Sequence, residues 1–292
     1  DVYGVNYDDT GMLFLTRTNQ TKSNEIAFCH ADYSGENRKV IYTFKNVWDI
    51  KGVTYRNGIL YVSYGNAYDA QGNVLEKPEV GILAYDIKEQ KEMDLFHDAQ
   101  INPAIMAVNA DGENVYFTYN YSSMTAKQAL KYAKNPEKSS KYQHTELRCV
   151  NRKTHEVRTV YTDLSACNYI ALLEHQLYAG RKDGIYVYDI KTETSKKIIS
   201  GQAELVPAYI DGKEQILVHT MEENAEAKYQ YWKNGKWIPI QSKEGCIACV
   251  GGYAYLLNGE GELCYQKTED FLASKGTAAM FEQEVYGDGK DD

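Results

Sequence analysis

The chain has 292 residues, of which 43% are hydrophobic, and it contains no long apolar run. A chain of this length and composition can bury a substantial core, which argues against disorder and against a membrane span. Its net charge is −9, and its basic residues are dispersed. Because nucleic-acid-binding proteins present a basic face to phosphate, we expect no nucleic-acid partner.

Tyrosine dominates the aromatic residues, with 26 tyrosines against 7 phenylalanines and 3 tryptophans. A tyrosine ring packs well on a sheet while its hydroxyl group reaches a polar partner. The composition therefore favours an all-β protein.

One short pattern occurs six times along the chain, in which an apolar residue is followed two positions later by a small residue and then by another apolar one. The small residues are Gly4, Gly52, Ala107, Ala171, Ala208 and Ala248. A turn follows each of them, and a second apolar strand begins soon after the turn. The central residues of these second strands are Phe14, Tyr61, Tyr116, Tyr178, Leu217 and Tyr255.

Most units continue with two further strands. The third strands begin near residues 26, 81, 146, 184, 228 and 261, and the more polar fourth strands near residues 38, 92, 156, 195 and 236. Six units of four short strands predict an all-β chain, a six-bladed β-propeller with four antiparallel strands per blade. We place the blades, in one domain, at residues 2–44, 47–98, 102–163, 165–201, 204–242 and 245–287. The small residues would let the innermost strands of neighbouring blades approach closely near the axis.

The second and third units are longer than the others, because insertions at 64–80 and 120–144 separate their second and third strands. In the later insertion, Ser122 or Ser123 is expected to cap a short helix that Asn135-Pro136 would end. Both loops should emerge on one face of a propeller. We therefore expect the two insertions to stand side by side over that face.

Aromatic residues gather in and around these insertions, and long loops on a rigid scaffold are where binding residues concentrate. Such rings can stack on a sugar or a peptide. The ligand-binding candidates are Trp48, Tyr64, Tyr68, Tyr119, Tyr121 and Arg181. A simpler interpretation is that some of the tyrosines are strand ends and others hold the insertions in place. The five lysines between residues 127 and 141 are likewise explained more simply as a solvated helix face than as an anion site.

A second set of polar residues falls near the start of the innermost strands. The metal candidates are Asp49, Asn168, Glu204 and Glu244. A ring of oxygen ligands at a channel mouth suits calcium, and six-bladed sugar lactonases use such a site with a metal-activated water. These carboxylates would equally solvate the channel mouth, and the chain carries no lactonase motif. The histidines are scattered, and no nucleotide-binding or hydrolase motif is present.

The chain has six cysteines, and Cys246 and Cys249 form a C-x-x-C spacing. Both occupy positions that the other repeats fill with apolar residues. In an extended strand, side chains three positions apart leave from opposite faces. We therefore expect buried structural thiols and neither a metal site nor a disulfide. Cys29, Cys149 and Cys264 share one position of the third strand. Whether Cys167 is paired stays open.

Residues 32–41, DYSGENRKVI, form a turn with Asp, Ser and Gly that is followed by Asn-Arg-Lys and aliphatic residues. This segment resembles the outer-strand signature of six-bladed propellers of the low-density-lipoprotein-receptor type and of their bacterial secreted or lipoprotein relatives of unknown function. The second strand of that family carries Tyr-Trp-Thr-Asp. Its nearest match here is YFTY at residues 116–119, and residues 61–64 and 14–17 are more distant matches. No unit has the final Asp, so the inter-blade hydrogen bonding of the family is not carried over.

The resemblance implies a secreted or cell-surface binding module. We predict a monomeric, non-catalytic, extracytoplasmic module without a cofactor, which contacts a protein or a carbohydrate through the face bearing the two insertions. The alternative is a metal-dependent hydrolase or lactonase with calcium at the channel mouth. The sequence shows no signal peptide, although a processed chain would look the same.

Overall fold

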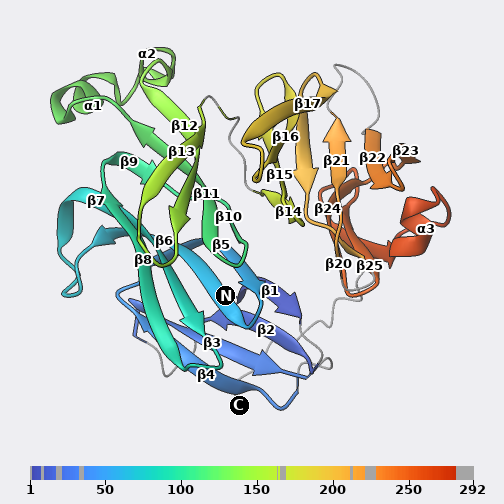
Figure 1. Ribbon diagram of the computed structural model, residues 1–292, viewed down its shortest axis with the longest axis horizontal. Helices are drawn as coiled ribbons and strands as arrows, with labels where there is room; N and C mark the ends of the chain where they lie inside the picture. Colours follow the sequence, from blue (N-terminus) through green and yellow to red (C-terminus); the bar gives the residue numbers. More distant parts are fainter. Residues whose placement is uncertain are drawn as a thin grey trace, which may run out of the picture. The chain divides into compact units, whose positions relative to one another are not determined.

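The computed structural model describes residues 2–7, 10–17, 22–32, 36–162, 164, 169–210, 213–220 and 228–280. Over these residues the chain is almost entirely β-structure (Figure 1). Its strands form six antiparallel sheets in chain order, each built around four strands, and one additional two-stranded sheet. The six sheets are the blades of a six-bladed β-propeller fold, as predicted from the repeat. None of the helices in these ranges is long and apolar enough to cross a bilayer.

Contacts divide the chain into two compact units, residues 1–172 with 179–182 (unit 1) and residues 173–178 with 183–292 (unit 2). Unit 1 contains the first three sheets. The first sheet consists of β1 (Val2–Tyr7), β2 (Met12–Thr16), β3 (Glu25–Ala31) and β4 (Lys39–Lys45). The second consists of β5 (Asp49–Arg56), β6 (Ile59–Tyr68), β7 (Val74–Asp86) and β8 (Lys91–Ala99). The third consists of β10 (Val108–Ala110), β11 (Asn114–Ser122), β12 (Gln143–Asn151) and β13 (Val157–Tyr161), and β9 (Ile101–Ala104) pairs with β11 as an additional strand.

The division into units runs through the fourth sheet, and unit 2 contains the fifth and sixth. The fourth sheet consists of β14 (Ala171–Leu173), β15 (Gln176–Arg181), β16 (Gly184–Asp189) and β17 (Thr194–Ser200). The fifth consists of β18 (Ala203–Val206), β21 (Leu217–Thr220), β22 (Lys228–Lys233) and β23 (Lys236–Gln241), with a small β19 (Tyr209–Ile210) and β20 (Lys213–Glu214) hairpin beside it. The sixth consists of β24 (Gly245–Val250), β25 (Tyr253–Leu257), β26 (Leu263–Lys267) and β27 (Ala279–Met280), with α3 (Thr268–Leu272) between its last two strands.

Apolar side chains from neighbouring sheets form the core. In unit 1, one cluster joins the first and second sheets and another joins the second and third. Tyr116 and Tyr119 are fully buried, and their hydroxyl groups donate to Asp111 (3.1 Å) and Asp98 (2.5 Å). In unit 2 the hydroxyl of buried Tyr229 accepts from the backbone N–H of Cys246 (2.6 Å). The tyrosine-rich composition therefore serves sheets in which the ring is buried and the hydroxyl is bonded.

A β-bulge marks the small residue of the second sheet. The register of β5 against β6 shifts between Ile50 and Val53, around Gly52. A Cβ atom added at Gly52 would lie 3.2 Å from the carbonyl oxygen of Met106 and 3.3 Å from the Cα of Ala107. The small residues of the second and third blades thus meet directly, and a larger side chain at Gly52 would force the neighbouring backbone to shift.

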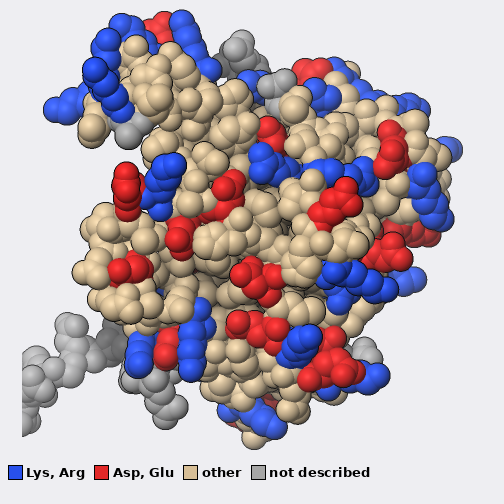
Figure 2. All heavy atoms as spheres, turned by 60° about the vertical axis from the view of Figure 1, so that its left-hand side comes forward, with Lys and Arg blue, Asp and Glu red and all other residues tan. Residues whose placement is uncertain are grey.

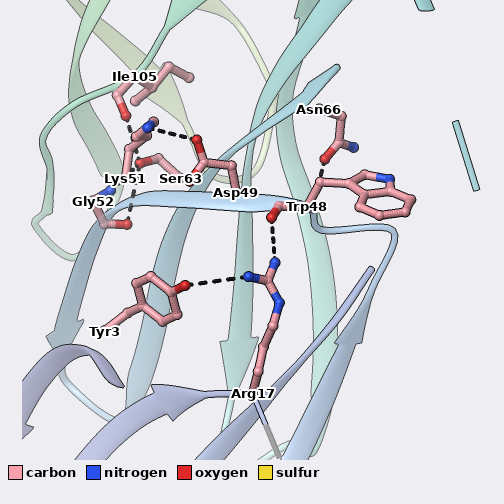
Figure 3. Close-up of polar contacts among 9 residues, drawn as sticks. All are labelled: Tyr3, Arg17, Trp48, Asp49, Lys51, Gly52, Ser63, Asn66 and Ile105. Carbon is pink, nitrogen blue, oxygen red and sulfur yellow. Dashed lines mark hydrogen bonds and ion pairs between the residues drawn. The ribbon is translucent and has the colours of Figure 1, made fainter. Parts of the chain in front are cut away.

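Hydroxyl groups from the second strands satisfy the backbone at these bulges. The N–H of Gly52 donates to Ser63 Oγ (2.7 Å), and the Ser63 hydroxyl donates to the carbonyl oxygen of Ile105 in the next blade (2.9 Å; Figure 3). In the third sheet the N–H of Ala107 donates to Thr118 Oγ1 (3.0 Å). Ser63 and Thr118 stand at the third position of the Tyr-Trp-Thr-Asp resemblance, so this position has a structural role in two blades.

In unit 2 the strands also meet at their small residues. Ala208 forms a parallel bridge with Cys249, and the N–H of Cys249 donates to the carbonyl oxygen of Pro207 (2.9 Å). The alanine thus lies against the first strand of the following blade. For Gly52, Ala107 and Ala208, the predicted close approach of neighbouring innermost strands is confirmed.

The expected orientation of the C-x-x-C pair is wrong. The register of β24 against β25 shifts between Cys246 and Ala248, so Ile247 is an extra residue in the strand. This bulge turns both cysteines toward the same side, where their sulfur atoms lie 3.9 Å apart in the core. The expectation of buried thiols is confirmed for the five cysteines in the described ranges, namely Cys29, Cys149, Cys246, Cys249 and Cys264. Cys167 lies outside those ranges.

Replacing Ser63 with alanine should destabilise unit 1. The change leaves the N–H of Gly52 and the carbonyl oxygen of Ile105 buried without their partner, and an unsatisfied buried polar group costs about 1–3 kcal/mol. We expect a lower melting temperature in calorimetry. Ser195→Ala, on the exposed edge of β17, is the control and should change little. Equal melting temperatures for the wild type and Ser63→Ala would contradict this role of the hydroxyl.

The native thiols should resist alkylation. The hydrogen bond with Cys249, together with burial, raises the pKa of Cys246, and burial raises the pKa of Cys149 to about 11. Since the thiolate is the reactive form, we expect slow modification by iodoacetamide at pH 8 in the native protein and rapid modification after denaturation. Fewer than four free thiols in the denatured, unreduced chain would overturn the assignment of structural thiols.

Candidate functional site

A cleft of about 370 Å³ opens in unit 1 beside β5, β6, β7 and β9. We call it the aromatic cleft, because three of the predicted ligand-binding residues, Trp48, Tyr64 and Tyr68, line it. The other lining residues on which its chemistry depends are Asp49, Lys51, Asn66, Pro78, Glu79 and Pro103. Its volume falls within the range of small-molecule sites, roughly 300–1,000 Å³.

Polar contacts fix the backbone of Trp48, which lies just before β5. Its N–H donates to Asn66 Oδ1 (3.0 Å), and the Asn66 amide in turn donates to the carbonyl oxygen of Asn46 (2.8 Å). Its carbonyl oxygen accepts a hydrogen bond from the Arg17 guanidinium, which also contacts the hydroxyl of Tyr3 (3.4 Å; Figure 3). The backbone of Trp48, and with it the base of the indole side chain, is therefore held in place before any ligand binds. This lowers the entropy cost of binding.

The rings of Trp48 and Tyr68 form an aromatic surface that is partly exposed to solvent. The Trp48 and Tyr68 rings lie 5.4 Å apart between centroids at an interplanar angle of 53°, and Tyr68 is 43% exposed. The indole Nε1 of Trp48 is buried, and no hydrogen-bond acceptor for it exists within the described ranges. A buried donor of this kind is uncommon in folded proteins and indicates a place for a ligand or water oxygen.

Tyr64 forms the buried wall of the cleft. Its ring packs over Gly81 of the paired strand β7, where an added Cβ atom would lie 2.4 Å from the Tyr64 hydroxyl oxygen. Burial, helped by nearby carboxylates, raises the pKa of Tyr64 to about 12. Its hydroxyl therefore stays neutral at physiological pH.

An ion pair lies among the residues that line the cleft. Lys51 Nζ and Asp49 Oδ2 are 2.7 Å apart, and both side chains are partly open to solvent. Such a pair adds little to stability, so a ligand can exchange for either partner at small cost. Sequence reasoning missed Lys51, although residues two positions apart in a strand share a face and Asp49 was already a candidate.

The insertion at 120–144 contains two short helices, α1 (Ala126–Tyr132) and α2 (Pro136–Ser140). The expected caps are wrong. Thr125 caps α1 through a reciprocal capping box with Gln128, whereas Ser122 lies within strand β11. Asn135 caps α2, so Asn135-Pro136 begins a second helix as well as following the first. Proline is favoured at the first position of a helix because its missing N–H is not needed there.

A second hollow, of about 580 Å³, lies between this insertion and β9. We call it the insertion groove. Its lining includes Met124, Leu130 and Tyr132 from the later insertion, Ile101 from β9 and Pro78 from the earlier one. Pro78 lines the aromatic cleft as well, so the two hollows share a wall. Residues of both insertions thus line one hollow, together with β9, a strand that the sequence did not predict. That the two insertions stand side by side over one face of the propeller stays a prediction.

The insertion that borders this groove is basic, and it also exposes an apolar side chain. Between residues 124 and 142 the chain has five lysines and one acidic residue, Glu137. Figure 2 shows Lys and Arg side chains gathered at the top left, where the α1–α2 insertion lies. Leu130 on α1 is 83% exposed. In a chain of net charge −9, this local positive charge can attract an acidic ligand.

Tyr119 and Tyr121 belong to a different cluster. Tyr119 is only 1% exposed, and the Arg148 guanidinium lies 4.0 Å from its ring centroid. The Tyr121 hydroxyl donates to Glu146 (2.9 Å), whose other oxygen accepts from Arg148 Nε (2.8 Å). The structure thus separates these two candidates from the aromatic cleft, and their polar groups are bonded within the protein.

The remaining candidates are dispersed. The Arg181 guanidinium lies 5.6 Å from the centroid of the Tyr161 ring. Glu204 contacts His219 Nδ1 (3.1 Å), and Glu244 accepts from the Ser242 hydroxyl (3.2 Å). Asn168 lies outside the described ranges. Across those ranges no three His, Cys, Asp or Glu side chains come together as metal ligands would.

The sequence matches no known protein family. It also matches no curated protein.

Several solved structures share the fold. TolB from Acinetobacter baumannii is 15% identical, with a TM-score of 0.53 over 88% of this chain and 61% of TolB. An oligogalacturonate lyase in complex with manganese is 9% identical, with a TM-score of 0.54 over 96% of this chain and 82% of the lyase. The acylaminoacyl peptidase of Pyrococcus horikoshii is 9% identical, with a TM-score of 0.57 over 90% of this chain and 44% of the peptidase. These likenesses show the β-propeller fold alone, and the chain spans less than two thirds of both TolB and the peptidase.

Replacing Glu146 with glutamine should destabilise unit 1 in a pH-dependent way. Burial opposes ionisation, but hydrogen bonds from Arg148, Tyr121 and Thr159 prevail and lower the pKa of Glu146. A lowered pKa gives stability that is complete above the usual carboxyl pKa and is lost as the pH falls through the lowered one. We expect the variant to be about 1 kcal/mol less stable at pH 7, with the difference shrinking in acid. Urea unfolding at pH 7 and pH 3 measures it, and a difference that grows in acid would contradict this assignment.

Proposed function

We propose that this chain is a non-catalytic, extracytoplasmic binding module that holds an extended polymer on the aromatic cleft and the insertion groove. The observation that carries the proposal is the pair of rings of Trp48 and Tyr68. Hydrogen bonds from Arg17 and to Asn66 hold the backbone of Trp48 in place. The extracytoplasmic location is supported by the resemblance of the repeat to secreted and cell-surface propellers. The specific relation to the low-density-lipoprotein-receptor type belongs to the same proposal.

Between the two ligand classes expected from the sequence, the cleft favours a carbohydrate. The apolar face of a sugar ring can stack on an exposed aromatic ring. Its hydroxyl groups can bind the Asp49–Lys51 pair. The five lysines between residues 127 and 141 favour a polymer that carries carboxylates. An acidic polysaccharide therefore fits both hollows at once.

Affinity gel electrophoresis of the full chain in polygalacturonate tests this proposal. We expect retardation in polygalacturonate and little in neutral dextran, because the lysines contribute attraction that added salt screens. Trp48→Ala and Tyr68→Ala should each weaken retention about 5- to 150-fold, since losing an aromatic anchor at a binding site typically costs about 1–3 kcal/mol.

Matched controls lie in unit 2. Tyr253 is 40% exposed, close to the exposure of Tyr68, so Tyr253→Ala tests whether the loss of any exposed tyrosine has the same effect. Trp237→Phe removes one of the two tryptophans outside the cleft. Equal retention of the wild type and Trp48→Ala would contradict the proposal. Absence of retention in any polysaccharide would reject the carbohydrate form of it and leave a protein segment as the ligand.

Deleting residues 124–140 tests the contribution of the insertion groove to binding separately from that of the aromatic cleft. We expect the melting temperature to stay close to that of the wild type, because most of the deleted side chains are exposed, while binding of the acidic polymer falls. The competing metal-dependent hydrolase predicts a calcium-dependent rise in melting temperature that disappears in an Asp49→Ala, Glu204→Ala double variant. That result would favour the enzyme over the binding module.

A further inference from the structure

Unit 2 contains a separate cavity of about 530 Å³ between the fifth and sixth sheets. It is bordered by the ends of β22 and β26, by the first turn of α3 and by Ile210. Its volume is again that of a small-molecule site. The binding face proposed above does not include this cavity.

Thr268 is the least expected residue of the cavity wall. It is 5% exposed, and its hydroxyl oxygen is buried without a hydrogen-bond partner in the described ranges. Its backbone N–H is satisfied by the carbonyl oxygen of Gly252 (2.9 Å). The hydroxyl alone is left over, and a buried hydroxyl without a partner destabilises a protein. Thr268 lines the cavity, so a ligand atom that reaches this hydroxyl when the site is filled is a direct explanation for its presence.

Charge and apolar surface meet in the same cavity. Lys233 and Lys267 both line it, and Glu269 is the one acidic lining residue, so the charged groups have a net positive charge. Ile210, Tyr231, Ile238 and Leu272 supply apolar walls. A ligand complementary to this lining has an anionic head that accepts hydrogen bonds and a short apolar body.

We propose that this cavity binds a small amphipathic carboxylate, such as a medium-chain fatty acid. Its carboxylate accepts a hydrogen bond from the Thr268 hydroxyl and pairs with Lys233 and Lys267. Its alkyl chain packs on Ile210, Tyr231, Ile238 and Leu272. Because the ligand, the residues and the unit all differ from those of the polysaccharide site, the two proposals stand or fall separately.

Isothermal titration of the full chain with decanoate, below its micelle concentration, tests the site. We expect one decanoate per chain and much weaker binding of decanol, which has the same chain without the charge. Affinity should fall up to about fourfold for each methylene removed in the series to hexanoate. A Lys233→Met, Lys267→Met double variant should lose at least tenfold in affinity. Lys236 is exposed at the start of β23 and is not a lining residue, so Lys236→Met should bind as the wild type does.

Thr268→Val gives the sharpest result, because it keeps the shape of the side chain and removes only the unpartnered hydroxyl. Without ligand, we expect this variant to melt at the same or a higher temperature than the wild type. With decanoate, we expect an affinity at least tenfold lower. Unchanged affinity in Thr268→Val or in the double lysine variant, or equal binding of decanol and decanoate, would overturn the proposal. Thr268→Ser, which restores the hydroxyl, should recover most of the binding.

Discussion

The close approach of the innermost strands is the constraint on which the other features depend. Where β5 meets the third blade, a side chain at Gly52 would press on the neighbouring backbone, and the strand forms a bulge there. A bulge leaves a backbone N–H without its ladder partner, and a buried N–H must find another. The Ser63 hydroxyl supplies one and reaches across to Ile105. One small side chain thus satisfies the bulge and ties two blades together.

The cleft follows from this arrangement. Since the Gly52 bulge fixes β5 against β6, the residues just before β5 are fixed as well. Trp48 then lies beside Asn66 on the extension of β6, and the side-chain amide of Asn66 bonds its backbone. The extension that carries Tyr68 continues the same strand. A rigid pair of strands therefore positions the aromatic side chains at the exposed end of the blade. Binding residues are commonly positioned in this way by a rigid scaffold.

The repeat of small residues was sufficient to predict six four-stranded blades, because alternation, turns and close approach are local or periodic properties. It failed where one residue breaks the period. The extra residue Ile247 reverses the parity of β24 and brings Cys246 and Cys249 together. No local rule marks β9, because four residues with a proline are a weak strand pattern and its pairing with β11 depends on the folded sheet. The Trp48–Tyr68 contact likewise joins segments that only tertiary structure brings together.

Buried polar atoms without partners connect the two proposed sites. Most polar groups in this fold are bonded even where a bulge or a strand end disrupts the ladder, as Ser63, Thr118 and Tyr119 show. Among the buried polar atoms that lack a partner in the described ranges, the indole Nε1 of Trp48 and the hydroxyl of Thr268 belong to residues that line hollows. A fold that needs these groups only for packing would be as stable with phenylalanine and valine in their place. The presence of both groups is explained if each completes its hydrogen bonding on a ligand, one in each unit.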